Sequence, residues 1–242
     1  VVILSAISND PMGKKFEVVT NSINYISVKK FVEAYVALPN KRLVFASSCS
    51  MYGTADGQAK NEVDILNPLT AYAKSKVAVE KVLERCDLGS GTTATALRFA
   101  TACGMSDRLR LDLVLNDFVA SALINNRIEI LSDGTPWRPL INVKDMSRAI
   151  EWAILRDERI STPYLSVNTG SNLWNYRVSE LANAVGNNVP GCEISINSQA
   201  SSDKRSYKVN FDLFESLAPN HQPLYTLEDT IAELIEGISE IR

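Results

Sequence analysis

A tyrosine and a lysine stand four residues apart in the segment Pro68-Leu-Thr-Ala-Tyr72-Ala-Lys-Ser-Lys76. Residues four apart lie on one face of a helix, and Pro68 is suited to lead into one. An ammonium near a phenol favours the phenolate, so Lys76 is expected to lower the pKa of Tyr72 below its usual value of about 10. The pair therefore predicts a tyrosine that works as an acid and base near neutral pH.

The spacing alone is weak, because Tyr25 and Lys29 repeat it in a place where we expect only a surface pair. Tyr72 differs because an apolar run upstream ends in the serine-rich stretch ASSCSMYG, residues 46–53. Ligands of open α/β sheets bind beyond the carboxyl ends of the strands. Small hydroxyl side chains at that edge could contact a flat ring or a sugar, although the same residues also suit a plain turn.

A parallel sheet is needed to bring these segments together, and the order of the expected elements provides one. Helical patterns over 16–38 and 70–86 alternate with β-rich runs at 1–4, 42–46 and 92–99. Such alternation favours right-handed βαβ units, and therefore an α/β fold with a parallel sheet.

Beyond Gly104 the alternation becomes less regular. We expect helices near 111–124 and 144–155 and short strands at 127–131 and 139–143. The segment Thr226-Leu-Glu-Asp229 resembles a capping box at the start of a last helix, followed by an apolar stripe.

Composition excludes several classes of function. The 242 residues are 45% hydrophobic with a net charge of -3 and no basic run, which excludes the broad electrostatic surface of a nucleic-acid binder. No apolar run is long enough to cross a bilayer. Four dispersed cysteines and one histidine form no convincing metal site, and reduced thiols fit a cytoplasmic protein.

Together, the serine-rich strand end and the Tyr72 helix resemble those of the extended short-chain dehydrogenase/reductases, in particular the NAD-dependent epimerase/dehydratase family that includes UDP-glucose 4-epimerase. The resemblance covers essentially the whole chain and includes VVILSAISNDP, LRFATACG and GTPWRPLINVKDM. It implies a Rossmann-like NAD-binding domain over 1–104. It also implies a smaller α/β substrate lobe over 105–242, from which a segment of about 139–170 returns to the sheet.

The resemblance also implies roles for individual residues. Tyr72 would be the acid/base, Lys76 would bind the nicotinamide ribose, and Ser48 would hydrogen-bond the substrate oxygen. NAD is the expected cofactor and NADP the alternative. Besides Tyr72 and Lys76, the residues expected near the cofactor are Ser5, Ala6, Asn24, Ser47 and Phe99. A helix amide satisfied by the backbone is the alternative role of Asn24.

The expected substrate is a nucleotide sugar, bound by Ser48 together with Thr101, Asn116, Arg138 and Arg205. A guanidinium pairs two phosphate oxygens at once, which suits Arg138 and Arg205 to a diphosphate, although either could be a surface arginine. Asn116 could equally be an ordinary helix amide. Two residues depart from the family pattern. Thr101 stands where UDP-hexose epimerases have asparagine, and Asn142 stands where histidine or tyrosine is common.

The family's chemistry points to an epimerase, with a ketoreductase as the alternative. Sugar-nucleotide 4,6-dehydratases of the family carry an Asp-Glu pair at the positions of Cys49 and Ser50, and neither of these side chains can act as a carboxylate.

The family's glycine-rich turn after its first strand is not found in these 242 residues, because Gly13, Gly53 and Gly57 do not reconstitute it. We therefore expect an N-terminally truncated chain with weak or no NAD binding, and a non-catalytic paralogue or fragment is the competing interpretation. By analogy with the family, a homodimer is expected. The identity of the sugar and of its nucleotide stays open.

Overall fold

Within the described residues, 1–157, 162–197 and 205–241, the computed structural model contains a central parallel sheet of four strands in the order β1-β2-β4-β8. These strands are β1 (Val2–Ile3), β2 (Arg42–Ser48), β4 (Thr93–Phe99) and β8 (Tyr164–Thr169). The α/β fold with a parallel sheet, expected from the order of the elements, is confirmed.

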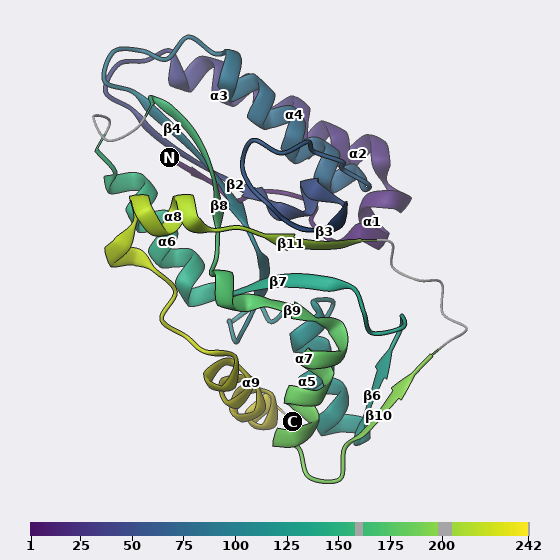
Figure 1. Ribbon diagram of the computed structural model, residues 1–242. Helices are drawn as coiled ribbons and strands as arrows, with labels where there is room; N and C mark the ends of the chain where they lie inside the picture. Colours follow the sequence, from purple (N-terminus) through teal and green to yellow (C-terminus); the bar gives the residue numbers. More distant parts are fainter. Residues whose placement is uncertain (158–161, 198–204, 242) are drawn as a thin grey trace.

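Helices cover both faces of this sheet (Figure 1). Leu43 and Phe45 of β2 pack with the helices of one face, whereas Val44 packs with those of the other. This alternation is the two-residue period of a strand buried on both faces. The helices are α3 (Val28–Val36) and α4 (Ala71–Arg85) on the first face, and α6 (Val143–Leu155) and α8 (Asp212–Leu217) on the second.

The first helical region begins earlier than the expected start at Phe16. The side chain of Asn9 accepts a hydrogen bond from the backbone N–H of Met12, at 3.0 Å, and so caps a helix there. The region then runs through α1 (Asp10–Lys15), α2 (Glu17–Asn21), the π-helical η1 (Ser22–Ser27) and α3.

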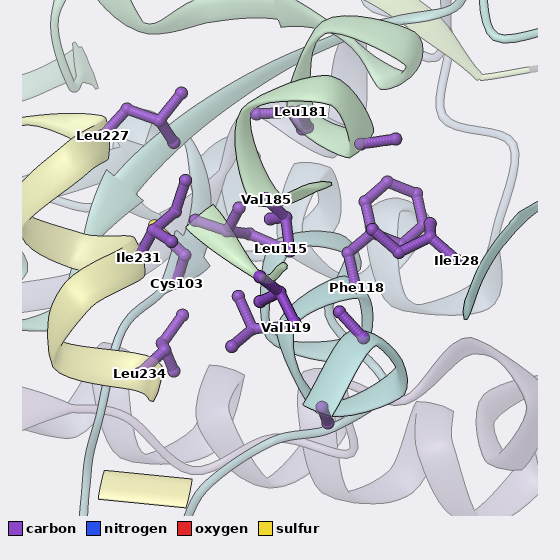
Figure 2. Close-up of a cluster of buried hydrophobic side chains, with 14 of the residues drawn as sticks. Cys103, Leu115, Phe118, Val119, Ile128, Leu181, Val185, Leu227, Ile231 and Leu234 are labelled. Carbon is purple, nitrogen blue, oxygen red and sulfur yellow. The ribbon is translucent and has the colours of Figure 1, made fainter. Parts of the chain in front are cut away.

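A second lobe is built from helices around its own core. Figure 2 shows Leu115, Leu181, Ile231 and neighbouring side chains converging between three helices. The elements of this lobe are α5 (Val114–Asn125), α7 (Val178–Asn188), α9 (Leu227–Ile241), and the parallel pair β6 (Arg127–Ile130) and β10 (Glu193–Ile196).

The capping box expected before the last helix is confirmed. The backbone N–H of Asp229 donates to Thr226 Oγ1 at 3.1 Å, and the backbone N–H of Thr226 donates to Asp229 Oδ2 at 3.0 Å. Two backbone donors at the start of α9 are thereby satisfied.

Short strands connect the two parts. The stretch after Gly53 contains a strand, and the strand over 137–142 pairs outside the central sheet. Of the segment 139–170, β8 joins that sheet and α6 packs on it. The connecting elements are η2 (Cys49–Tyr52), β3 (Thr54–Lys60) paired with β11 (Ser206–Val209), the sheet β5 (Thr101–Cys103), β7 (Trp137–Asn142) and β9 (Asn175–Arg177), η3 (Asn172–Trp174) and η4 (Pro219–His221).

Candidate active site

Helix α4 carries Tyr72 and Lys76 on successive turns. Thr70 caps the helix, because its Oγ1 accepts a hydrogen bond from the backbone N–H of Ala73 at 3.1 Å. The helix packs against β2 and η2. Lys76 Nζ lies 5.3 Å from the centroid of the Tyr72 ring, which is the shared face expected from their spacing.

The ammonium of Lys76 is buried beneath Tyr72 with a side chain that is 3% exposed. Its Nζ donates to the carbonyl of Ala46 and lies 4.6 Å from the centroid of the Phe45 ring. Burial lowers the pKa of Lys76 to about 8, against the opposing effect of the Glu80 carboxylate. An ammonium has three N–H donors, and within the described residues only the Ala46 carbonyl accepts a hydrogen bond from it.

Ser48 ends β2 and begins the turn η2. Its Oγ accepts a hydrogen bond from the backbone N–H of Ser50 at 3.2 Å and donates to Ser50 Oγ at 2.9 Å. In the sheet register Ser48 pairs with Phe99 of β4, and Phe99 pairs with Thr169 of β8. These three residues therefore mark one carboxyl edge of the sheet, where ligands of such folds bind.

The side chain of Ser47 points towards α4. It is 2% exposed, and its hydroxyl donates to Glu80 Oε1. The Glu80 carboxylate also accepts hydrogen bonds from Arg98, with Nη2 to Oε2 at 2.7 Å and Nε to Oε2 at 3.0 Å. Because this hydroxyl is committed to Glu80, a contact between Ser47 and a cofactor would have to come from its backbone.

Arg98 extends this buried polar network towards the loop that follows β3. Its Nη1 donates to Tyr52 Oη at 3.1 Å and to the Glu62 carbonyl at 3.0 Å. Tyr52 donates in turn to Asn168 Oδ1 at 2.7 Å. Burial raises the pKa of the Tyr52 phenol, so this second tyrosine near the strand end stays protonated.

The loop after β1 contains Ser5, which is exposed, and Ala6, which is half-buried, both beyond the end of that strand. The side chain of Asn24 on η1 is hydrogen-bonded to the backbone of this loop. Its Nδ2 donates to the Ile7 carbonyl at 2.9 Å and its Oδ1 accepts from the Ile7 N–H at 2.8 Å. Asn24 is 2% exposed, so it positions the loop, as in the backbone-satisfied alternative.

A second set of contacts ties the same loop to the other lobe. Arg110 pairs with Asp112 through two hydrogen bonds of 2.7 Å, and its Nη1 donates to Ser8 Oγ at 2.9 Å. Asn9 Nδ2 donates to Asp112 Oδ2 at 2.8 Å. The pKa of Asp112 is lowered to about 2, chiefly by its hydrogen bonds from Arg110. Residues 8 and 9 are thus fixed against the segment that precedes α5.

The two arginines expected at the substrate come together. Arg138 on β7 is buried, and its Nη1 donates to the main-chain carbonyl of Arg205 and to that of Trp137. Arg205 comes directly before β11 and is half-buried. The guanidinium of Arg138 therefore lies beside the backbone of Arg205.

Asn116, expected near the substrate, is buried rather than a surface amide, and its side chain bonds the backbone. Asn116 on α5 accepts from the Gly104 N–H and donates to the Arg110 carbonyl, both at 3.0 Å. Asn142 caps α6 and donates to Thr230 Oγ1 at 3.0 Å. Thr101, half-buried on β5, pairs in register with Leu140. Asn116 and Asn142 thus fix loops and helix ends around the lobe.

Three residues with a part in the site were not found from the sequence. Glu80 and Arg98 form the ion pair next to Ser47, and Arg110 bridges the two lobes. The position of Glu80 four residues after Lys76 was an available signal, because it places both on one helix face. Nothing local in the sequence connects Arg98 or Arg110 with their partners.

Two features are absent from the described residues. No cluster of three or more His, Cys, Asp or Glu side chains could hold a metal ion there. In the same part of the chain, no helix combines the length and apolarity needed to cross a membrane.

Curated proteins match part of the chain. The uncharacterized UDP-glucose epimerase YtcB of Bacillus subtilis (strain 168) is 27% identical over 127 residues, 52% of this chain and 39% of that protein. The matched stretch thus spans well under half of the relative.

Solved structures match over the whole chain. The structure of MoeE5 in complex with UDP-glucuronic acid and NAD superposes with a TM-score of 0.85 at 25% identity, covering 100% of this chain and 79% of that one. The UDP-glucuronic acid 4-epimerase of Bacillus cereus shares the fold, with a TM-score of 0.82 at 19% identity and coverage of 100% and 76%.

The model of the NAD dependent epimerase/dehydratase family matches residues 1–168, which include the whole strand end and the Tyr72 helix. The chain belongs to the NAD-dependent epimerase/dehydratase family.

Proposed function

We propose that the protein is an NAD-dependent epimerase that acts on a nucleotide sugar. The observation that carries this proposal is the ammonium of Lys76, which is almost wholly buried, lies under the Tyr72 ring and has N–H donors beyond the one bound by Ala46. Keeping such a charge out of water is costly. A buried ammonium with spare donors beside a phenol suits an acid/base site that completes its hydrogen bonds with a ligand.

In this proposal each side chain has one task. Tyr72 accepts the proton of a sugar hydroxyl and later returns it, and the charge of Lys76 favours the phenolate. The remaining Lys76 donors fit the hydroxyls of a ribose. Ser48 can turn its hydroxyl proton from Ser50 to the reacting oxygen while still accepting from the Ser50 N–H. When bound, NAD supplies the hydride acceptor and donor.

The remaining expected cofactor contacts are consistent with this edge of the sheet. Phe99 is the last residue of β4 and pairs with Ser48, and Ser5 and Ala6 lie beyond the end of β1. Asn24 supports the loop of Ser5 and Ala6 through Ile7. We infer that residues 1–104 supply these contacts and that residues 105–242 supply the substrate lobe.

A water-eliminating dehydratase is disfavoured at this site. Cys49 occupies the first position where a carboxylate would be needed, and it is fully buried with its thiol directed to the Arg98 carbonyl. Burial raises the pKa of this thiol far above neutral pH. Ser50, at the second position, exchanges hydrogen bonds with Ser48.

For the substrate we propose a UDP-sugar, held on its diphosphate side by Arg138 and Arg205. Arg138 on β7 and Arg205, directly before β11, would provide the paired donors that a diphosphate requires. The relatives' own descriptions name UDP-glucose and UDP-glucuronic acid. We also place the protein in the cytoplasm, in keeping with the free thiols of its four cysteines.

Proton NMR of the sugar tests this function. This chain, and any longer polypeptide that contains it, is incubated with NAD and with UDP-glucose or UDP-glucuronic acid. An epimerase produces the anomeric signals of a second UDP-sugar at the same oxidation level. Conversion only of a 4-keto sugar with NADH would instead identify the ketoreductase alternative, and no change with any nucleotide sugar would contradict catalysis.

We further propose that two copies pair through α3 and α4. A groove between these helices is lined by Lys29 and Glu33 on one side and by Ala78 and Lys81 on the other. Ala78→Arg places a long, charged side chain in the groove. A monomer can extend this side chain into solvent, whereas a close interface between two copies has no room for it. Light scattering should give twice 26.6 kDa for the unchanged chain and 26.6 kDa for the variant. Equal masses would contradict pairing at this groove.

A further inference from the structure

The ion pair of Glu80 and Arg98 lies directly behind the acid/base pair, and the proposed reaction leaves it without a task. Glu80 is 4% exposed and Arg98 5% exposed, and their side chains meet at 2.7 Å. A buried pair of this kind gains little stability over apolar side chains of similar size. Its position, one helical turn from Lys76, suggests another role.

We propose that Glu80 is a positioning residue for Lys76, and that Arg98 and Ser47 set how much of its negative charge acts on that ammonium. The proposal rests on the proposed function, because it concerns the protonated state of the lysine beside Tyr72. It assigns Glu80 no contact with substrate or cofactor.

The geometry gives Glu80 two sets of partners. On the side of the sheet, Arg98 and Ser47 occupy its oxygens with charge-assisted hydrogen bonds. Along its own helix it lies one turn from Lys76, on the same face of α4. The ammonium of Lys76 contacts the Phe45 ring, the Tyr72 ring and the Ala46 carbonyl. The carboxylate is thus bonded to the guanidinium of Arg98 and acts on the ammonium of Lys76 through its charge.

The other titratable groups of this region act on Glu80 and Arg98. Tyr52 and Cys49 on η2 and Glu62 in the following loop lie around Arg98, and burial keeps the thiol and the phenol protonated. Tyr164 on β8 also stays protonated because of burial, with Glu80 adding to the effect. Within the described residues, Glu80 is therefore the anion that acts on Lys76.

These charges determine the direction in which each substitution shifts the pKa of Lys76. Glu80→Gln removes the anion, so the ammonium of Lys76 loses its proton at lower pH. Arg98→Met removes the guanidinium cation from the Glu80 carboxylate and leaves Lys76 as the neighbouring cation, so Lys76 holds its proton to higher pH. If Glu80 and Arg98 were only a structural pair, both substitutions would loosen the packing around Lys76. The pKa of Lys76 would then shift in the same direction in both variants.

Competitive acetylation followed by mass spectrometry measures the proton on Lys76 without NAD, substrate or turnover. The chain is labelled with a trace of acetic anhydride from pH 6 to pH 11, and chymotryptic peptides are fragmented to read each lysine separately. Lys74, which is exposed on the same helix, serves as the internal reference. Glu84→Gln, one turn beyond Glu80 and exposed, is the matched control variant.

The midpoint of Lys76 labelling should fall by about one pH unit in Glu80→Gln, rise in Arg98→Met and stay in place in Glu84→Gln. An unmoved midpoint in Glu80→Gln, or a shift in the same direction in both variants, overturns the proposal. If either single variant fails to fold, Glu80→Gln/Arg98→Met leaves no charge buried alone, and its midpoint should still lie below that of the unchanged chain. A normal or higher midpoint there also overturns the proposal.

This result is independent of the function proposed above. Inactivity towards nucleotide sugars leaves the labelling curves unaffected, and a failed labelling prediction leaves the NMR assay to decide the reaction.

Discussion

Replacing Lys76 with methionine should make the stability of the chain depend on pH in a different way. Burial lowers the pKa of Lys76 from 10.5 to about 8, and one pKa unit corresponds to about 1.4 kcal/mol. Folding with a protonated Lys76 therefore costs about 3 kcal/mol more than folding with a neutral one. The side chain is 3% exposed, so solvent screening reduces this figure little.

The direction of the stability change follows from the pKa of Lys76, which is lower in the folded chain than in the unfolded chain. Below pH 8 the lysine is charged in the folded and the unfolded chain, and the full cost is present. As the pH rises from 8 to 10.5 the folded chain loses the proton first, so the unfolded chain binds more protons and stability increases. Methionine carries no such cost. From pH 7 to pH 10 the unchanged chain should therefore gain about 2 to 3 kcal/mol relative to Lys76→Met.

Urea unfolding followed by circular dichroism at pH 7 and pH 10 measures this difference. Groups away from Lys76 that titrate in this range behave alike in both proteins, so their effects cancel in the comparison. Tyr72 lies 5.3 Å from Lys76 Nζ, so both proteins carry Tyr72→Phe to remove its titration. Lys74→Met, which removes an exposed lysine from the same helix, should show no such pH dependence. A gap between the proteins with and without Lys76→Met that is the same at both pH values would refute the burial of a charged Lys76.

Two further substitutions test the surroundings of the site. Gly53→Ala should destabilise the chain by more than about 1 kcal/mol, because Gly53 has a φ of +65° and an added Cβ would lie 1.9 Å from the Asn67 carbonyl oxygen; a urea midpoint within error of the parent would contradict this. Asp112→Asn should lower stability at pH 7 by less than about 1 kcal/mol, since Asp112 is largely exposed and its ion pair with Arg110 is screened. The stability that Asp112 contributes is present above its unfolded pKa of about 4 and is lost as the pH falls through its folded pKa of about 2. The acid unfolding curves of the two proteins should therefore converge near pH 2. A constant separation down to pH 2 would contradict a stabilising pair of Asp112 and Arg110.

The sequence predicts the parts of the molecule whose signals are local. The capping box of Thr226 and Asp229 and the helix from Thr70 are such cases, because caps and spacing lie within a few residues. The start of the first helix was misjudged because Asn9 supplies its cap, ahead of the first apolar residues of the pattern. The residues of β3 show no apolar alternation that would predict a strand. Its strand conformation comes from pairing with β11, which follows about 150 residues later in the sequence.

In the site, too, the residues related by local spacing could be predicted, and those brought together by tertiary contacts could not. Tyr72 and Lys76 are related by helix geometry, and the chemistry of the pair is legible in their spacing. The Glu80 and Arg98 pair is formed only when α4 packs on β4, and Arg110 meets Ser8 only when the lobes come together. Such contacts depend on tertiary structure, and neither residue type nor spacing predicts them.

The proposed acid and base is Tyr72, and a comparison of two phenylalanine variants tests this role most directly. Tyr25 has the same spacing to a lysine but is half-buried on η1, where it packs against the core between α3, α4 and β2, so Tyr25→Phe is the matched control. The measurement is the initial rate at which a second UDP-sugar forms in the NMR assay. We predict a loss of at least about a hundredfold in Tyr72→Phe and an unchanged rate in Tyr25→Phe. Equal rates in the two variants would contradict the assignment of Tyr72 as the acid and base.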